Sequence, residues 1–420
     1  MKISRESLLL LAPATYLFVL PLAHTTALRS VAFVVSVLLL IWAWRTDTTA
    51  PIPLKVPFAA WFAVALLSLI WAVHPDYSIG EIKSEIVYGF LTFAIFFTLT
   101  HERRELNFWI AVLAASSLMV GAFALVQFLR GISLNEVGMY GGTLHYSAYL
   151  ITVMPLFLAA ALLWPGRRRF AMVGLVFFLL LTGYCTKNRG LWISLIVELV
   201  IFGYMYLRYL NLNIERRKSI FAIMVLVVIA MTIAFVTVSG ERLATDSGER
   251  LGPNSSTGEV LSGTIQIDPR PKLWQDSFAW IMQRPWTGAG FGRMVLSREF
   301  QQQAGLATHT HAHNIALNYA IELGFLGPIV LGLLVFCIFR ELLKATRMAD
   351  RDARTLGIAG LAIVAGVFGV EGMIEDLFFR HLGWMFWALI GMILGYSSNV
   401  ARQTPLVEDQ PASSVASSIA

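Results

Sequence analysis

Long apolar runs recur from one end of the chain to the other, and they constrain its fold more than any other feature. A helix needs about 20 apolar residues to cross the hydrocarbon core of a bilayer. We expect about twelve such spans, centred on residues 8–22, 30–44, 56–73, 86–99, 108–129, 144–164, 170–185, 191–210, 219–238, 315–339, 357–374 and 377–396. The sequence therefore predicts an all-α integral membrane protein with one polytopic domain over residues 1–398.

The composition agrees with a chain that lives in a bilayer. It is 57% hydrophobic and 14% charged, whereas soluble proteins carry about 45–50% apolar and about 25% charged residues. Soluble enzymes and nucleic-acid-binding proteins are excluded. The first run follows Lys2 and Arg5, and we expect it to stay as a helix rather than be cleaved as a signal peptide. Cys185 and Cys337 fall in apolar runs near opposite membrane faces, which favours neither a disulfide framework nor a zinc site.

The basic residues sort onto alternate loops and so orient the chain. The richer side carries Lys2, Arg5, Arg45, Lys55, Arg103, Arg104, Arg167, Arg168, Arg169, Arg208, Arg216, Arg217, Lys218, Arg340, Lys344, Arg347, Arg351 and Arg354. The positive-inside rule makes this side cytoplasmic and places both termini there. The formal net charge of +6 is thus mainly a topology signal. The short outer loops hold only Arg29, Lys83, Arg130, Lys187 and Arg189.

One connection is much longer than the others. Residues 239–312 form an outer-face loop between the ninth and tenth spans, and loops beyond about 15 residues are usually functional or disordered. Its first half, 247–263, has the composition of a flexible segment. Its second half predicts a short helix after Asp268, with Trp274, Phe278, Ile281 and Met282 on one face. That face would lie on the bilayer surface or on the protein itself. Residues 399–420 predict a disordered cytoplasmic tail.

Ionisable groups on the outer face are candidates for chemistry, because such groups are costly near a membrane. The set consists of Lys187, Arg189, Arg270, His309, His311, His313, Glu371, Glu375, Asp376, Arg380 and His381. Alternate histidines in the segment 309–313 would suit zinc or copper, but no nearby Cys or acidic helix pair completes a metal site. Asp350-Arg351-Asp352 matches a cation-binding Asp-x-Asp, yet its place in a basic cytoplasmic loop favours a solvated turn.

A third interpretation uses two arginines as a phosphate clamp. A guanidinium binds phosphate bidentately and needs no metal. Arg189 lies in a polar turn between two spans, and Arg270 precedes a helix whose N-terminus also favours an anion. Salt bridges to Glu371, Glu375 or Asp376 are the structural alternative for both. His313 leads into Asn314 and an apolar helix; it would act as a general base or merely cap that helix.

These residues resemble a known family. Segment 313–327 reads HNIALNYAIELGFLG and matches the His-(Asn/Ser/Gln)-x9-Gly-x2-Gly signature of the O-antigen ligases within the O-antigen ligase and polymerase superfamily. Supporting pieces are Asn188-Arg189-Gly190, the Arg270–Trp274 stretch with the Gly-rich run 284–292, and, less closely, segment 141–150.

The resemblance implies an inner-membrane glycosyltransferase that moves a glycan from undecaprenyl pyrophosphate to the lipid A–core oligosaccharide at the periplasmic face. It implies no cofactor or metal, and inversion at the sugar. His313 would be the base, and Arg189 and Arg270 would hold the pyrophosphate. The predicted substrate-binding residues are Lys187, Asn188, His311, Asn314, Trp274, Arg380 and His381.

The superfamily leaves other activities open. A polymerase would extend a lipid-linked chain, and a protein O-oligosaccharyltransferase would glycosylate Ser or Thr. One large outer loop and a short C-terminal tail favour a ligase over both. A transporter would be expected to carry inverted repeats and broken helices, and we see no such repeat in the sequence.

Overall fold

The computed structural model describes residues 10–46, 50–132, 134, 142–210, 213–246, 270–302, 310–376 and 380–403. Within these ranges the chain forms helices and no strand, which confirms the predicted all-α class. The helices are α2 (Leu11–Val19), α3 (Thr26–Thr46), α4 (Lys55–Ser68), α5 (Pro75–Glu81), α6 (Tyr88–Thr98), α7 (Arg103–Leu129), α8 (Thr143–Leu163), α9 (Gly166–Tyr184), α10 (Arg189–Tyr209), α11 (Ile214–Asp246), α13 (Arg270–Gln283), α14 (Ser297–Gln302), α15 (Ile315–Leu323), α16 (Leu326–Ala345), α17 (Arg351–Val364), α18 (Gly372–Ile374) and α19 (Arg380–Gln403).

Eight helices of the described chain are long and apolar enough to cross a membrane. They overlap eight of the predicted spans, and the other four predicted spans fall on α2, α4, α6 and α9. Two π-helical segments, Ile82–Val87 and Ala365–Glu371, join α5 to α6 and α17 to α18 without a break. The protein is therefore an all-helical membrane protein, and the total of twelve spans stays a prediction.

The centre of the bundle is the contact between α6 and α19. A side chain added at Gly391 would come within 2.6 Å of the Phe93 carbonyl oxygen, so the two backbones can approach this closely only because glycine has no Cβ. Trp387 fills the adjacent space, with its ring centroid 4.5 Å from that of Phe58. This apolar core supports the helices that carry the outer site.

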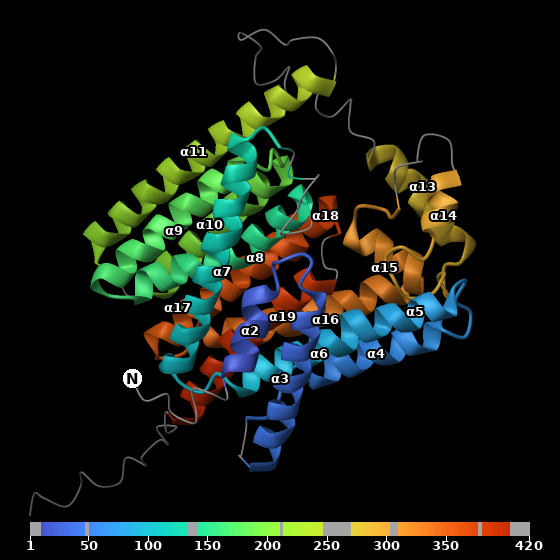
Figure 1. Ribbon diagram of the computed structural model, residues 1–420, viewed down its shortest axis with the longest axis horizontal. Helices are drawn as coiled ribbons and strands as arrows, with labels where there is room; N and C mark the ends of the chain where they lie inside the picture. Colours follow the sequence, from blue (N-terminus) through green and yellow to red (C-terminus); the bar gives the residue numbers. More distant parts are fainter. Residues whose placement is uncertain are drawn as a thin grey trace, which may run out of the picture.

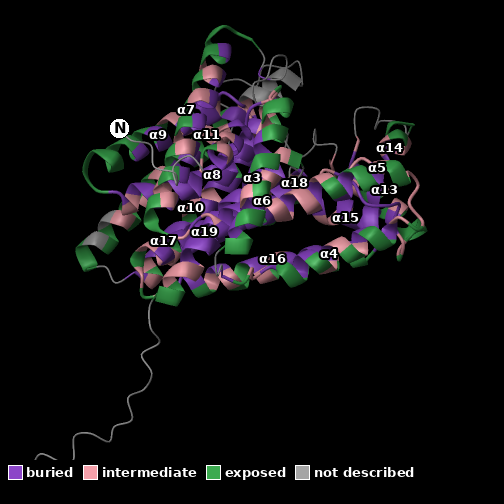
Figure 2. Ribbon diagram, turned by 60° about the horizontal axis from the view of Figure 1, so that its bottom comes forward, coloured by how far each residue is buried: buried purple, intermediate pink, exposed green. Residues whose placement is uncertain are grey.

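One predicted span is wrong as a single helix. Residues 315–339 form two helices, because the chain breaks at Gly324, which has a φ of 63°. A side chain there would also lie 2.5 Å from the Pro285 carbonyl oxygen. The first helix, α15, consequently leaves the line of α16. In both views, α13, α14 and α15 gather with α5 at one end of the molecule, beyond the main bundle (Figures 1 and 2).

Two predicted boundaries also shift. α11 continues to Asp246, seven residues past the predicted start of the outer loop at 239, and α19 continues to Gln403, into the predicted disordered tail. In α19 the Asn399 amide donates to the Gly395 carbonyl at 2.9 Å within the helix, so the change to polar residues at 399 does not end the helix. The segment 247–263, Asp268, His309 and residues 404–420, on which other predictions fall, lie outside the described residues.

Candidate active site

The histidine segment is held in place by the start of α15. Asn314 caps this helix, since its side-chain oxygen accepts a hydrogen bond from the Leu317 N–H at 3.0 Å, while its amide donates to the Met373 carbonyl at 2.9 Å. Asn318 accepts from the Ala312 N–H at 2.8 Å. His313 has a φ of 48°, an uncommon conformation for a residue with a side chain. The helix cap and these bonds therefore fix the direction of the His313 ring.

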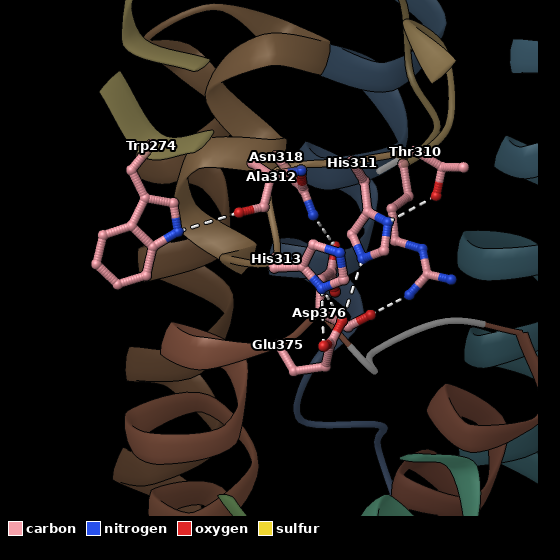
Figure 3. Close-up of polar contacts among 9 residues, drawn as sticks. Trp274, Thr310, His311, Ala312, His313, Asn318, Glu375 and Asp376 are labelled. Carbon is pink, nitrogen blue, oxygen red and sulfur yellow. Dashed lines mark hydrogen bonds and ion pairs between the residues drawn. The ribbon is translucent and has the colours of Figure 1, made fainter. Parts of the chain in front are cut away.

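Glu375 bridges two histidines of this segment (Figure 3). His313 Nδ1 lies 2.7 Å from both carboxylate oxygens, and His311 Nε2 lies 3.2 Å from Oε1. Burial would raise the pKa of the Glu375 carboxyl, but the hydrogen bonds from His311 and His313 outweigh it and hold that pKa well below its ordinary value. The acid is thus an ionised acceptor.

The ionised carboxylate determines the tautomer of both rings. It only accepts hydrogen bonds, so the hydrogen lies on Nδ1 of His313, and in the neutral ring Nε2 is the nitrogen that can take up a proton. In His311 the hydrogen lies on Nε2, and Nδ1 accepts from the Thr310 hydroxyl at 3.0 Å. Burial lowers the pKa of His311 to about 4, with a further contribution from the positive charge of Arg293, although the Glu375 hydrogen bond opposes this.

His311 and His313 differ in exposure, and this separates what each can do. The His313 side chain is 21% exposed, and that of His311 is 7% exposed. A neutral, buried His311 can orient Glu375 but is poorly placed to meet a substrate. His313 is the more exposed ring, and a carboxylate fixes the orientation of its imidazole, as in sites of proton transfer.

Arg189 and Arg270 each begin a helix, α10 and α13, and Glu371 lies near the start of α10 and within the electrostatic reach of Arg270. Asn188 caps α10 by accepting from the Gly190 N–H at 2.9 Å. A side chain at Gly190 would lie 2.9 Å from the Glu371 carboxylate, and the charge of Arg270 also acts on Glu371. Glu371 is one helical turn before Glu375, and the Glu375 N–H donates to its carbonyl at 2.7 Å. α18 thus brings both helix starts near the histidines.

Two of the predicted substrate-binding residues brace the fold here. Trp274 donates from its indole N–H to the Ala312 carbonyl at 3.1 Å, which ties α13 to the histidine segment (Figure 3). Arg380 lies 3.1 Å from Glu81 in an ion pair, which the sequence did not suggest, and its contact with substrate stays a prediction.

The remaining predicted residues lie at the edge of the site. The Lys187 ammonium is 4.0 Å from the Tyr184 ring centroid and 5.7 Å from that of Phe128, which is a cation–π arrangement. His381 stacks on His145, with ring centroids 5.8 Å apart. Their proposed contacts with substrate stay predictions.

The comparison with known families supplies the decisive observation. A family model described as O-Antigen ligase matches residues 174–332, a range that contains Arg189, Arg270 and His313. The match covers less than half of the chain and supports a place in the O-antigen ligase and polymerase superfamily. No curated protein matches it. Glu371 and Glu375 lie C-terminal to the matched range and are added to the ligase-family segment by the tertiary fold.

One cation beside the site, Arg293, was not predicted from the sequence. The Arg293 guanidinium donates to the Asp376 carbonyl, and Asp376 in turn accepts from the Asn318 amide at 2.6 Å. The charge of Arg293 also acts on His311. The sequence feature that could have pointed to Arg293 is the Gly-rich run 284–292 just before it. In that run the Gly292 N–H donates to the Glu322 carboxylate at 2.9 Å.

The structure also changes the metal alternative. The sequence suggested no acid to complete a histidine site, but Glu375 now joins His311 and His313, and their ligand atoms lie within 4.8 Å of one another. Two imidazoles and a carboxylate are a suitable donor set for zinc or iron. However, the 2.7 Å separation of His313 Nδ1 from Glu375 is that of a direct hydrogen bond, and the same atoms cannot do both.

Proposed function

We propose that this protein is an O-antigen ligase that transfers O-antigen polysaccharide from undecaprenyl pyrophosphate to the lipid A–core oligosaccharide. The observation that carries the proposal is the His313–Glu375 pair, which lies one helical turn from Glu371, the acid near the start of α10 and Arg270, in a chain whose residues 174–332 match the O-antigen ligase family. This pair supplies a base, and the two helix starts supply positive charge for a leaving pyrophosphate.

In the proposed reaction, His313 Nε2 takes the proton from an acceptor hydroxyl as its oxygen attacks the anomeric carbon. A carbon–oxygen bond forms on one face of the sugar, the bond to the pyrophosphate breaks on the other, and the anomeric centre inverts. The electron pair leaves with undecaprenyl pyrophosphate. Glu375 keeps the imidazole oriented and stabilises the imidazolium that forms.

Arg189 and Arg270 are proposed to bind the pyrophosphate and to stabilise the charge that develops on it. Each guanidinium can form two parallel hydrogen bonds with phosphate oxygens. The first N–H groups of α10 and α13 add the positive end of a helix dipole. A pyrophosphate with this support is a good leaving group, so the proposal needs no separate general acid, metal or nucleotide sugar.

The cellular placement belongs to the same proposal. We place the protein in the bacterial inner membrane as one polytopic domain over residues 1–398, with cytoplasmic termini. The site lies at the periplasmic face, within and beside the loop 239–312. The alternation of basic residues supports this orientation. Arg189, Arg270 and His313 all fall in or next to loops on the side that is poor in Lys and Arg.

Deletion of the gene, followed by analysis of surface lipopolysaccharide and lipid-linked polymer together, tests the assignment. A ligase predicts long polymer retained on the undecaprenyl carrier and bare core, restored by the wild-type gene but not by His313→Ala. Core that carries one repeat would instead indicate a polymerase, and unchanged lipopolysaccharide with unglycosylated protein would indicate a protein transferase. Loss of polymer from the outer face, with no stranded donor there, would favour a transporter.

A further inference from the structure

Three large apolar side chains are exposed along one line of α13 and the turn after it. Phe278 is 55% exposed, Met282 is 53% exposed and Trp286 is 70% exposed. These residues are four apart in the sequence. Phe278 and Met282 therefore lie on one face of α13, and Trp286 follows them in the turn after the helix. We refer to Phe278, Met282 and Trp286 as the outer strip. Exposed contiguous apolar surface of this kind marks a contact with a partner or a membrane.

The rest of α13 divides into two further faces. Leu273, Ser277 and Ile281 are buried, and Leu273 and Ile281 pack in a small core with α15. Lys272 and Gln283 are exposed on a polar side. Of the four residues expected to share a face, Trp274 and Ile281 therefore lie toward the protein and Phe278 and Met282 away from it. A helix with one buried, one polar and one exposed apolar face fits a boundary between protein, water and a third, apolar phase.

The outer strip is continuous with the apolar surface of a candidate membrane span. The Trp286 ring meets the Phe325 ring edge-on, with centroids 5.6 Å apart, at the start of α16. The Phe325 N–H also donates to the Pro285 carbonyl at 2.8 Å. From there, α16 exposes a further series of large apolar side chains, namely Leu326, Ile329, Leu333, Phe336 and Phe339. An apolar surface along a membrane span is the surface that contacts lipid chains.

We propose that the outer strip lies in the bilayer, at the boundary between headgroups and acyl chains, so that α13 is an interfacial helix. The partner is a lipid surface rather than a second protein, because the strip extends the lipid-facing side of α16 without a polar gap at the Trp286–Phe325 contact. Trp286 is also of the residue type that is enriched at membrane interfaces.

This placement has a consequence that rests on the proposed function. Arg270 is the first residue of α13, and Trp274 ties the helix to the histidine segment. A helix held at the interface keeps Arg270 near the depth of lipid headgroups, where the pyrophosphate of a polyprenyl donor lies. The outer strip would then position the clamp relative to the membrane without contacting the phosphate itself.

Spin labels on the full-length protein test the lipid contact directly. The variants are Phe278→Cys and Met282→Cys, with Lys272→Cys and Gln283→Cys as matched controls on the polar face, all in a Cys185→Ala, Cys337→Ala background. The protein is reconstituted in phosphatidylethanolamine and phosphatidylglycerol vesicles. Labels at 278 and 282 are expected to be several-fold more accessible to oxygen than to a water-soluble nickel chelate, and those at 272 and 283 to show the reverse.

Either of two other outcomes would overturn the lipid contact. Equal nickel accessibility at all four positions would place the strip in water, and protection of 278 and 282 from both reagents would indicate that protein covers it. Transfer by Phe278→Lys and Gln283→Lys then tests the consequence: we expect a several-fold higher KM for the lipid-linked donor only in the first. A measured lipid contact with an unchanged KM would refute the positioning role alone. If the unlabelled wild-type protein shows no transfer at all, the proposed function is refuted instead.

Discussion

The contact between α6 and α19 and the outer site around Glu375 are built from opposite kinds of interaction. The first joins Gly391, Phe58, Phe93 and Trp387 by close apolar packing. The second joins segments about 60 residues apart through charged and polar side chains. The core should therefore respond to changes of volume and be insensitive to pH, whereas the site should respond to changes of charge and proton affinity. The predictions below probe this difference.

His313→Ala should have the largest effect on activity. Loss of a general base typically reduces a rate by about 10²–10⁴-fold, while a ring that is partly exposed contributes little to folding. The rate of transfer to core oligosaccharide by the purified protein measures the effect on activity, and the melting temperature measures the effect on folding. His101→Ala, far from the site in the sequence, is the control. Wild-type transfer by His313→Ala would end the base assignment.

Arg270→Lys should be next, with a loss of about 10²-fold in transfer, as for removal of one donor to a developing negative charge. Lysine keeps the charge but not the two-pronged guanidinium. Arg284→Lys, an exposed arginine just beyond the end of α13, should retain activity. Full activity of the Arg270 variant would show that a point charge suffices and that the clamp geometry is wrong.

Gly391→Leu tests the other region and should act on stability. The added side chain meets the Phe93 and Phe97 backbone, and overpacking of this kind costs about 3 kcal/mol. Gly174→Leu is the matched control, because nothing lies within 4 Å of a side chain added there. Unfolding in detergent should separate the two at every pH. An equal stability of both variants would contradict the close packing of α6 on α19.

The pH dependence of stability should come from the site. Because the folded pKa of His311 is lowered from 6.5 to about 4, the unfolded chain binds more protons between these values, and stability falls as pH falls through that window. The loss should be about 3 kcal/mol. Glu375, whose pKa is lowered, loses its contribution only at more acidic pH. His311→Gln should flatten the slope between pH 6.5 and 4, and an unchanged slope would place its origin elsewhere.

Removal of divalent metal should have the smallest effect. The direct His313–Glu375 hydrogen bond uses the atoms that a metal would need, so transfer in the presence of a chelator should equal that of untreated protein. Activity that requires added zinc or another divalent ion would make the His311, His313 and Glu375 set a metal site and would replace the base mechanism.

Much of the fold could be predicted because each span carries its own signal. All twelve predicted apolar runs contain helix, since a bilayer requires long apolar segments whatever their neighbours are. The start of α15 could also be predicted from nearby residues, because Asn314 caps the helix by accepting a hydrogen bond from Leu317, three residues away. The break at Gly324 could not be predicted in this way, because it depends on the close approach of the Pro285 carbonyl from a distant segment.

The sequence by itself determined the membrane class, the helices, and the presence of His313, Arg189 and Arg270 in a family-type pattern, because these follow from local composition and spacing. Only the tertiary structure decided their partners. Glu375 reaches His313 across 62 residues, Arg293 reaches Asp376 across 83 residues, and Arg380 is paired with Glu81 from the other half of the chain. A buried charge takes whichever partner helix packing brings within a few ångströms, and sequence spacing does not encode that distance.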